Sequence, residues 1–259
     1  MRLPLYVVNA FVEQPFSGNP AAVCLPGVFP EPRLMQAIAA QNNLSETAFV
    51  VRDGKGWQIR WFTPTAEVDL CGHATLAAAA VVLRFEEPDA HAVAFESAGG
   101  PLNVSARGDD LVLDFPARPP VETDAAAIDE ALGVRAESCW AAEGNHMAVL
   151  GDEGTLRALR PDYALVAALG ETGLIVTAPG SSADFVSRYF GPAVGVPEDP
   201  VTGSAHCTLV PYWSRRLGRA ELLAHQVSPR GGVLRCRDRG ERVDIAGRVH
   251  FYLQGHIEF

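Results

Sequence analysis

The hydrophobic and polar positions of the chain predict many short strands and a few helices. Short apolar or alternating runs that are bounded by turn-forming residues are typical of strands. In the first half of the chain we expect strands at residues 3–11, 21–25, 47–52, 57–63, 92–96, 101–107 and 111–115. In the second half we expect strands at residues 138–142, 146–150, 173–178 and 185–190, and a strand-rich tail at 221–259.

One predicted helix differs from the others because it is apolar on every side. Residues 72–85 have the strongest helical composition of the chain, and residues 75–83 carry apolar side chains all around the helix. A helix of this kind must be buried. Further helices are expected from Pro32 to a stop at 41–43, at 124–132, at 163–169, and from about Gly203, where Pro211 should kink the helix or end its first segment.

A proline-rich segment divides the chain into two halves that resemble each other. Residues 116–120 (PARPP) predict a boundary between an N-terminal lobe at 1–117 and a C-terminal lobe at 118–259. The sequence ETAFVV at 46–51 resembles ETGLIV at 171–176, and a hairpin, a loop and a buried helix follow each. The helix starts, CGHA at 71–74 and TGSA at 202–205, also align. These similarities predict a duplicated structural unit.

Composition and charge exclude two classes of partner. The 259 residues are 48% hydrophobic, which is enough for a substantial core. With 31 acidic and 21 basic residues, the net charge of −10 argues against the basic surface that nucleic-acid binding requires. The longest apolar run, at about 76–83, is far shorter than the roughly 18 residues of a membrane span. We therefore expect neither nucleic acid nor a membrane as a partner.

The cysteines and the N-terminal residues bear on the cellular compartment. The five cysteines are odd in number and form no C-x-x-C pair, so they fit free thiols in a reducing compartment better than a disulfide framework. The N-terminal segment reaches Asn9 and Glu13 too early to contain the apolar core of a signal peptide. On both grounds we expect a cytoplasmic protein.

The scarcity of lysine excludes pyridoxal phosphate as a cofactor and excludes a P-loop. Lys55 is the only lysine, and the sequence DGKG at 53–56 predicts a surface hairpin turn. A pyridoxal phosphate enzyme needs a buried lysine, and a P-loop needs a lysine after its glycines. His206 and Cys207 resemble a metal-binding pair only superficially, because adjacent helical side chains diverge and no further ligands stand at zinc-like spacing. We expect neither a cofactor nor a metal ion.

Each of the two predicted buried helices begins with a glycine. The free N–H groups at a helix start carry partial positive charge, and a glycine lets a ligand approach the backbone closely. Two such helix starts that face each other across a cleft between the lobes would bind a small carboxylate without any lysine. The alternative is that Gly72 and Gly203 only permit tight turns.

A series of short motifs extends over nearly the whole chain. In order they are NAF at 9–11, GNPAAV at 18–23, SETAF at 45–49, FTP at 62–64, EVDLCGHAT at 67–75, EDPVTGSAH at 198–206 and QxSPRGG at 226–232. Together they resemble the PhzF-type phenazine biosynthesis-like family, which is related to diaminopimelate epimerase. The resemblance implies an α+β fold of two pseudo-symmetric lobes, each a curved sheet or barrel around a central buried helix.

The resemblance also implies a site and a chemistry. It implies an active site in the cleft between the lobes, proton transfer at carbon without a cofactor, and commonly a homodimer. In such proteins the last strand often returns to the N-terminal lobe. Position by position, Glu46 matches the general acid/base of the family, and His73, Asp199 and Ser204 match polar groups of its pocket. These four residues are the catalytic candidates; the substrate-binding candidates are Asn19, Cys71, Gly72 and Gly203.

These residue types suit proton transfer without a metal or a cofactor. A glutamate in an apolar cleft has a raised pKa, which brings it closer to working pH. A histidine at a helix N-terminus should be largely neutral because of the helix dipole. Ser204 and the Gly203 amide could hold a carboxylate, and Asp199 could orient an amine, a hydroxyl or a histidine.

Each candidate also has a purely structural interpretation. Glu46 would then be a solvated residue at a strand edge, since most glutamates are exposed. His73 and Ser204 would only cap their helices, and Asp199 would be a turn residue. Cys71 occupies the position at which related epimerases keep a catalytic thiol, but its counterpart Thr202 is not easily ionised. A mechanism with two thiols is therefore disfavoured, whereas a one-sided thiol mechanism stays open.

The sequence thus leads to one main hypothesis and two alternatives. The main hypothesis is a cofactor-independent isomerase that shifts a proton between carbons of a small carboxylate-bearing metabolite, with Glu46 as general acid/base. The first alternative is an epimerase or a dehydratase of an amino or hydroxy acid that uses Cys71 as its base. The second is a metabolite-binding protein without catalysis on the same scaffold. The resemblance does not name the substrate.

Overall fold

The chain forms two compact units. The computed structural model describes residues 2–54, 56–170 and 172–259. Unit 1 comprises Met1–Asp114 and Ala246–Phe259, and unit 2 comprises Phe115–Ile245. The chain therefore enters unit 2 close to the predicted boundary after residue 117, and its last residues belong to unit 1. Lys55 and Glu171, which contributed to the predicted hairpin turn and to the internal repeat, lie outside the described residues.

Unit 1 is built on a ring of strands. Its strands are β1 (Arg2–Val12), β2 (Asn19–Cys24), β3 (Glu46–Asp53), β4 (Gly56–Phe62), β5 (Glu67–Val68), β6 (Ala92–Ser97), β7 (Gly100–Arg107), β8 (Asp110–Pro116) and the final part of β17 (Arg242–Glu258). β17 pairs with β1, and the pairing then continues through β2, β3, β4, β6, β7 and β8. Because β8 also pairs with β17, the strands close into a barrel.

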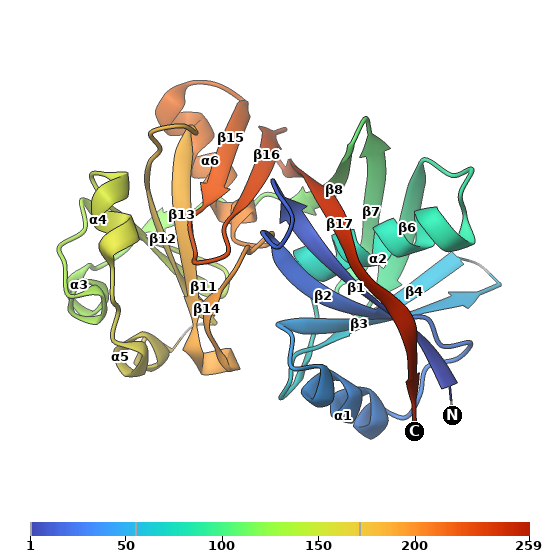
Figure 1. The fold of residues 1–259 in the computed structure, drawn as a ribbon. Coiled ribbons are helices and arrows are strands. Elements are labelled where there is room, and N and C mark those ends of the chain that lie inside the picture. Colours follow the sequence, from blue (N-terminus) through green and yellow to red (C-terminus); the bar gives the residue numbers. More distant parts are fainter. Residues whose placement is uncertain (1, 55, 171) are drawn as a thin grey trace. The chain divides into compact units, whose positions relative to one another are not determined.

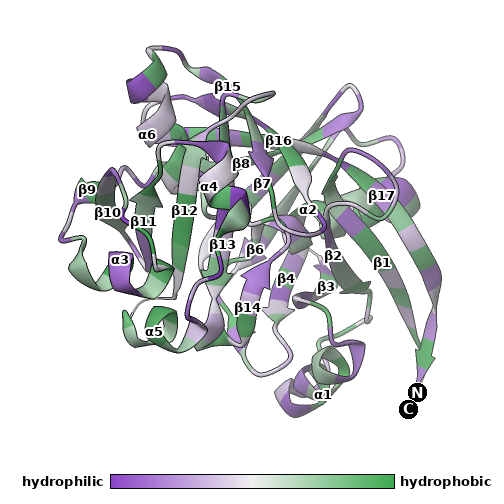
Figure 2. Cartoon of the chain, turned by 60° about the vertical axis from the view of Figure 1, so that its left-hand side comes forward, coloured by the Kyte–Doolittle hydropathy of each residue, from purple (hydrophilic) through white to green (hydrophobic). Residues whose placement is uncertain are grey.

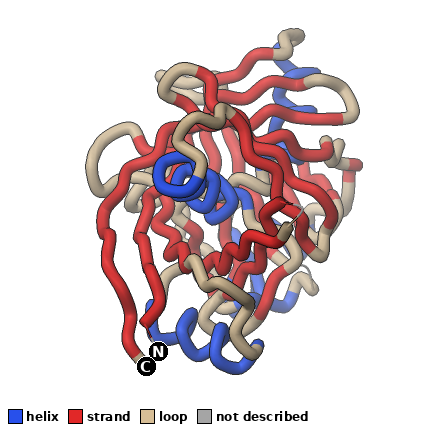
Figure 3. Tube along the Cα trace, turned by 90° about the vertical axis from the view of Figure 1, so that its right-hand side faces the viewer, coloured by secondary structure: helices blue, strands red, loops and turns tan. Residues whose placement is uncertain are grey.

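The barrel of unit 1 contains the predicted apolar helix. α2 (Gly72–Val81) continues into a π-helical turn, η1 (Val82–Glu86), and every residue of α2 is buried. Figure 3 shows this helix with strands on all sides of it. A helix satisfies its own backbone hydrogen bonds and can therefore occupy a barrel interior, and its run of alanines leaves room for the strands around it. The prediction of a buried helix over this segment is confirmed.

A second helix packs on the outside of the same unit. α1 (Pro32–Asn42) has proline in its first turn and ends at Asn43, which adopts the left-handed conformation with φ of 51°. Its buried residues Met35 and Ile38 join a core cluster with Phe49. Figure 1 shows α1 next to β3. The predicted start and stop of this helix are confirmed.

Unit 2 contains a second mixed sheet. Its strands are β9 (Val121–Glu122), β10 (Ser138–Ala142), β11 (Asn145–Val149), β12 (Gly173–Pro179), β13 (Phe185–Gly191), β14 (Val196–Asp199), β15 (Glu221–Gln226) and β16 (Gly232–Asp238). Its smaller helices are α3 (Ala126–Leu132), α4 (Glu153–Ala158), α5 (Tyr163–Ala168) and the 3₁₀ turn η2 (Pro192–Val194). Apolar residues of α3, α4 and α5 form one core cluster with the strongly apolar strand β12, which is mostly green in Figure 2.

The order of strand pairing in unit 2 repeats that of unit 1. In unit 1, β1–β2 is antiparallel, β2–β3 parallel, β3–β4 antiparallel, β4–β6 parallel and β6–β7 antiparallel. In unit 2 the pairs β10–β11, β11–β12, β12–β13, β13–β15 and β15–β16 follow with the same directions. Each unit also carries a short strand, β5 or β14, directly before its long helix. The predicted duplication and the predicted fold class are confirmed.

The long helix of unit 2 begins later than the sequence predicted. α6 extends over His206–Leu217, three residues beyond the expected start at Gly203. The preceding residues form a tight turn, in which the His206 N–H donates to the Gly203 carbonyl at 3.0 Å and the Cys207 N–H donates to the Ser204 carbonyl at 3.1 Å. Hydrogen bonds of this i to i−3 type are common at helix starts. Gly203 and Ser204 therefore lie in a turn before the helix.

Pro211 does not end α6, because its effect on the helix is compensated. A proline inside a helix lacks the N–H that would bond to the carbonyl four residues earlier, here that of Cys207. In the structure the Arg118 N–H donates to the Cys207 carbonyl at 2.8 Å. Arg118 belongs to the proline-rich segment that the sequence analysis treated only as a boundary. Of the two effects predicted for Pro211, the end of a first helical segment is therefore wrong, and the kink stays a prediction.

Candidate active site

The predicted site residues of unit 1 come from three elements. Asn19 begins β2 and Glu46 begins β3, while Cys71 is the N-cap of α2 and His73 lies in its first turn. β2 and β3 are parallel neighbours, with Ala21 opposite Glu46, so both strands begin on the same side of the barrel. The N-terminus of α2 lies on this side too, since His73 contacts both Asn19 and Glu46. Residues far apart in the sequence therefore meet at one end of α2.

His73 is at the centre of this group. Its Nε2 atom lies 3.2 Å from Oε2 of Glu46. Its Nδ1 atom lies 3.2 Å from Nδ2 of Asn19 and 3.5 Å from Sγ of Cys71. The imidazole is almost completely buried, with 4% of the side chain exposed. Both ring nitrogens are therefore in contact with side chains that the sequence analysis had selected.

The neighbours of His73 define its protonation state. An amide NH₂ group can only donate, so Nδ1 is the acceptor of the Asn19 hydrogen bond. The ring hydrogen is then on Nε2, which faces Glu46. Burial lowers the pKa of His73 to about 3, so the ring is neutral near pH 7. A neutral histidine was expected from the helix dipole, but burial is the cause in the structure.

Glu46 is enclosed rather than solvated. Its side chain is 16% exposed, and its Oε2 atom is buried. This environment does not fit the alternative of a solvated residue at a strand edge. The Oε2 and Nε2 atoms are within hydrogen-bonding distance, but they are not aligned as a hydrogen bond. Catalytic contacts are often poorly aligned before the substrate binds.

The other selected residues of unit 1 are buried around His73. Asn19 has no exposed surface and makes its contact with the imidazole. Gly72 is the first residue of α2 and is buried. Cys71 is 5% exposed, and its carbonyl accepts a hydrogen bond from the Thr75 hydroxyl. The structure therefore places Asn19 in contact with His73, and no local sequence pattern reveals this contact between residues 54 positions apart.

The same residues include donor atoms for a metal ion. One donor atom each of Glu46, Cys71 and His73 lies within 4.8 Å of the others. A thiolate, an imidazole and a carboxylate are a ligand set that zinc accepts. Cys71 contacts Nδ1 of His73, however, whereas Glu46 contacts Nε2. An ion bound to one ring nitrogen would therefore require at least one of these side chains to move.

The predicted residues of unit 2 form a separate group around Asp199. Asp199 ends β14 and is buried, and its Oδ2 accepts a hydrogen bond of 2.6 Å from the Thr202 hydroxyl. Gln226, at the end of β15, contacts both residues. Thr202 and Gln226 stand in the motifs at 198–206 and 226–232, but no role in the site was predicted for either. Their positions in these motifs, and the alignment of Thr202 with Cys71, were the sequence signals that could have identified them.

Gly203 and Ser204 lie in the turn before α6, next to a buried histidine. Nδ1 of His206 lies 2.9 Å from the Thr202 carbonyl. Burial lowers the pKa of His206 to about 4, although the hydrogen bond to Thr202 opposes this shift. In unit 1 the predicted residues thus gather around His73, whereas in unit 2 Asp199 bonds to Thr202, and Gly203 and Ser204 follow in the turn. That both groups act on one substrate stays a prediction.

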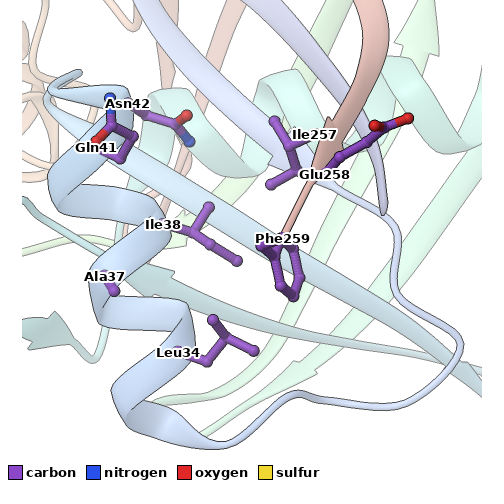
Figure 4. Close-up of a pocket in the computed structure, with 8 residues that line it drawn as sticks. All are labelled: Leu34, Ala37, Ile38, Gln41, Asn42, Ile257, Glu258 and Phe259. Atoms are coloured by element: carbon purple, nitrogen blue, oxygen red, sulfur yellow. The ribbon is translucent and has the colours of Figure 1, made fainter. Parts of the chain in front are cut away.

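Unit 1 also contains a pocket beside its outer helix α1. It lies between α1 and the end of β17, and Figure 4 shows its lining side chains. The lining residues are Leu34, Ala37, Ile38, Gln41, Asn42, Ile257, Glu258 and Phe259. This lining is largely apolar, with Glu258 as its one acidic side chain and neither histidine nor cysteine. None of the predicted site residues lines this pocket.

Comparisons with known proteins agree with the motifs. The family model described as phenazine biosynthesis-like protein matches residues 8–255. An uncharacterized isomerase of Pseudomonas aeruginosa is 49% identical over 258 residues, and one of Halalkalibacterium halodurans is 40% identical over 262 residues; each alignment covers 99% of both chains. The crystal structure of a PhzF-family phenazine biosynthesis protein of Enterococcus faecalis has a TM-score of 0.95 at 43% identity and covers 100% of both chains. Among the described residues, no helix has the length and hydropathy needed to cross a membrane.

Proposed function

The chain belongs to the phenazine biosynthesis-like protein family, and on this premise we propose that it is a cofactor-independent isomerase. It moves a proton between carbons of a small carboxylate-bearing metabolite, with Glu46 as general acid/base. Membership of the family supports an isomerase or epimerase role, because relatives over the full length are named isomerases. The observation that carries the mechanism is the enclosed Glu46 carboxylate 3.2 Å from a buried, neutral imidazole.

The reaction needs only a group that accepts a proton and returns it. The Glu46 carboxylate removes a proton from carbon, and the electron pair of the broken C–H bond enters a new C=C bond. The electrons of the existing C=C bond then form a bond between the second carbon and the proton that Glu46 delivers; in deuterated water the Glu46 carboxyl exchanges its proton for a deuteron before delivery. Glu46 gives back one hydrogen for each one it takes up, so atoms and electrons balance. A side chain held close to both carbons is sufficient for such a transfer.

His73 supports this transfer as a neutral hydrogen-bond donor. With its hydrogen on Nε2, the ring can donate to Oε2 of Glu46 when the two groups align. Because its pKa is about 3, His73 does not become an imidazolium near pH 7 and does not compete for the proton. Its role is to hold the carboxylate while the protonation state of that group changes.

The remaining candidates would bind and orient the substrate. The N–H groups at the start of α2, from Gly72 onward, suit a carboxylate because a helix N-terminus favours anions. In unit 2, Ser204 and the Gly203 amide would hold an anionic group, and Asp199 would orient an amine or a hydroxyl. These roles follow from the family resemblance and are part of the proposal.

The experiment that tests the proposal is isotope exchange. The protein is incubated in deuterated water with a panel of small amino and hydroxy carboxylates, with and without a C=C bond, and label incorporation at carbon is followed by NMR. Glu46→Gln should reduce exchange by about 10³-fold, within the range that general acid/base groups contribute. Glu96→Gln is the matched control, since Glu96 is an exposed residue of β6 in the same unit. A folded Glu46→Gln protein with full exchange would overturn the mechanism.

A second candidate function uses Cys71 as the base. The observation that favours it is the contact of 3.5 Å between Sγ of Cys71 and Nδ1 of His73, next to the start of α2. A thiolate is stabilised at a helix N-terminus. The protein would then be an epimerase or a dehydratase, and Cys71→Ser would abolish exchange. Binding of a panel compound without any exchange would instead favour the third possibility, a metabolite-binding protein.

Two further features of the proposal are a homodimer, which the resemblance implies, and a cytoplasmic location, which the scattered cysteines predict. We propose that the protein is a homodimer and that it acts in the cytoplasm. Light scattering coupled to size-exclusion chromatography measures the molar mass in solution. A mass near 27.7 kDa, that of one chain, would contradict the dimer.

A further inference from the structure

The motif at 226–232 has no part in the proposed reaction, but its first residues hold the segment that carries Asp199. Nε2 of Gln226 donates to the Asp199 carbonyl at 2.8 Å and to the Thr202 hydroxyl at 3.1 Å. Oε1 of Gln226 accepts the Thr202 N–H at 2.8 Å. The Ser228 hydroxyl donates to the Pro200 carbonyl at 2.7 Å. The end of β15 therefore fixes both sides of the segment between Asp199 and Thr202.

These hydrogen bonds also fix the direction of the Thr202 hydroxyl. The oxygen accepts from Gln226, and its single hydrogen points to Oδ2 of Asp199 at 2.6 Å. A distance of roughly 2.5–2.7 Å is typical of a hydroxyl that donates to a charged carboxylate. Gln226 is 1% exposed and Thr202 is 8% exposed, so water competes little for these bonds. The chain of donors runs from the Gln226 amide through Thr202 to Asp199.

We propose that Gln226 and Thr202 are positioning residues that hold Asp199 as an oriented carboxylate. This inference rests on the proposed function only in assigning Asp199 a part in the reaction. A hydrogen bond to the charged form of an acid favours that form. A group locked before the substrate arrives loses no freedom during the reaction, which raises the rate. Gln226 and Thr202 act through Asp199 and need not contact the substrate themselves.

The first test separates this role from a general contribution to folding. Thr202→Val keeps the shape of the side chain and removes its hydroxyl, whereas Thr202→Ser keeps the hydroxyl. Thr177→Val is the matched control, because the buried Thr177 hydroxyl of the same unit donates to the Val186 carbonyl and accepts from Trp213. We expect Thr202→Val to lower kcat of the isotope exchange by about 10- to 100-fold. Thr202→Ser should restore most of it, and Thr177→Val should leave kcat unchanged.

The second test needs no substrate. With ¹³C-labelled aspartate, the Cγ resonance of Asp199 is identified by its loss in Asp199→Asn. In the wild type and in Thr202→Ser we expect one sharp resonance at the position of an ionised carboxylate at pH 7. In Thr202→Val and in Gln226→Glu, which retains the acceptor but loses the amide donor, this resonance should shift or broaden.

The outcomes distinguish this inference from the proposed function. If no panel compound exchanges its hydrogen, the proposed function fails, but the Cγ resonance still decides on the role of Thr202 and Gln226. If exchange depends on Glu46 while Thr202→Val has wild-type kcat and an unchanged Cγ resonance, the proposed function stands and the inference is overturned. Loss of kcat in Thr202→Ser equal to that in Thr202→Val would also overturn it.

Discussion

Glu46 in unit 1 and Asp199 in unit 2 are both enclosed carboxylates next to a buried polar side chain, but their surroundings hold them differently. Asp199 accepts a hydrogen bond of 2.6 Å from Thr202, whose own position is fixed by Gln226. Glu46 lies 3.2 Å from His73 without the alignment of a hydrogen bond. A group that transfers protons must change its protonation state, whereas a group that orients a substrate works best when fixed. The hydrogen bond from Thr202 therefore supports Asp199 as the orienting group, and we expect Glu46 to carry the proton.

In each unit one polar side chain lies between an amide and a carboxylate, and the two units use different residues for it. In unit 1 the residue between an amide and the carboxylate is an imidazole, with Asn19 on one side and Glu46 on the other. In unit 2 the residue between an amide and a carboxylate is Thr202, which lies between Gln226 and Asp199. Each unit thus carries an amide, an intermediate polar side chain and a carboxylate, although Thr202 aligns with Cys71 and not with His73 in the duplicated sequence. Of these two intermediate side chains, only the His73 imidazole can take up a proton and become charged.

The largest effect should come from exchanging each carboxylate for its amide. Glu46→Gln removes the proton carrier and should lower the isotope-exchange rate by about 10³-fold, whereas Asp199→Asn removes only an orienting charge and should lower it by about tenfold to 100-fold. The exchange rates of both variants, measured with the same panel compound, give the ratio of the two losses. Equal losses would remove the distinction between the two carboxylates.

The two buried histidines, one in each unit, should make the stability of the protein depend on pH. The pKa of His73 is about 3 and that of His206 about 4, both below the ordinary value of 6.5 because of burial. Below pH 6.5 the unfolded chain binds protons that the folded chain does not, so the free energy of unfolding falls as the pH falls toward these values. Each histidine should contribute about 2 kcal/mol to the loss between pH 7 and pH 5.

Urea unfolding of the wild type, His73→Phe and His206→Phe at pH 7 and pH 5 measures these contributions. Between the two pH values, each variant should lose less free energy of unfolding than the wild type does. The difference should equal the contribution of the missing histidine, about 2 kcal/mol. A variant with the same loss as the wild type would show that its histidine is protonated in the folded protein at pH 5.

A smaller effect should follow from removing the amide that orients His73. Asn19→Leu keeps the approximate volume but leaves Nδ1 without its amide donor, so the hydrogen is no longer held on Nε2. We expect the exchange rate to fall by about tenfold, the effect of one buried hydrogen bond. The imidazole NMR shifts of His73 report which ring nitrogen carries the hydrogen. An unchanged tautomer in Asn19→Leu would contradict this role of Asn19.

The smallest effect should come from Cys71. If Glu46 carries the proton, Cys71→Ser should change the exchange rate by less than about threefold, because the smaller hydroxyl still fits beside His73. The four other cysteines are buried, and burial raises the pKa of Cys24 and Cys207 to about 12 and that of Cys139 to about 11. A thiol reagent that abolishes exchange in the wild type but not in Cys71→Ala would therefore act at Cys71, and such a result would favour the thiol mechanism.

The local sequence was sufficient to predict features that depend on neighbours along the chain. The apolar run at 75–83 predicted the buried helix α2, and the proline and asparagine at its ends predicted α1. The short elements β5, β9, β14 and α4 were not predicted. Strands of two to four residues have too few positions to show a period, so pairing with a neighbour is what creates them.

The sequence alone determined the duplicated architecture, the buried helix and the identity of the polar residues, because side-chain periodicity and motifs are properties of consecutive positions. Only the tertiary structure decided how these residues act on each other. It placed Asn19 on His73, Gln226 on Thr202 and Arg118 on the carbonyl that Pro211 leaves without its helical partner. Each of these contacts joins residues that are distant in sequence, and buried polar groups must find such partners because water cannot supply them.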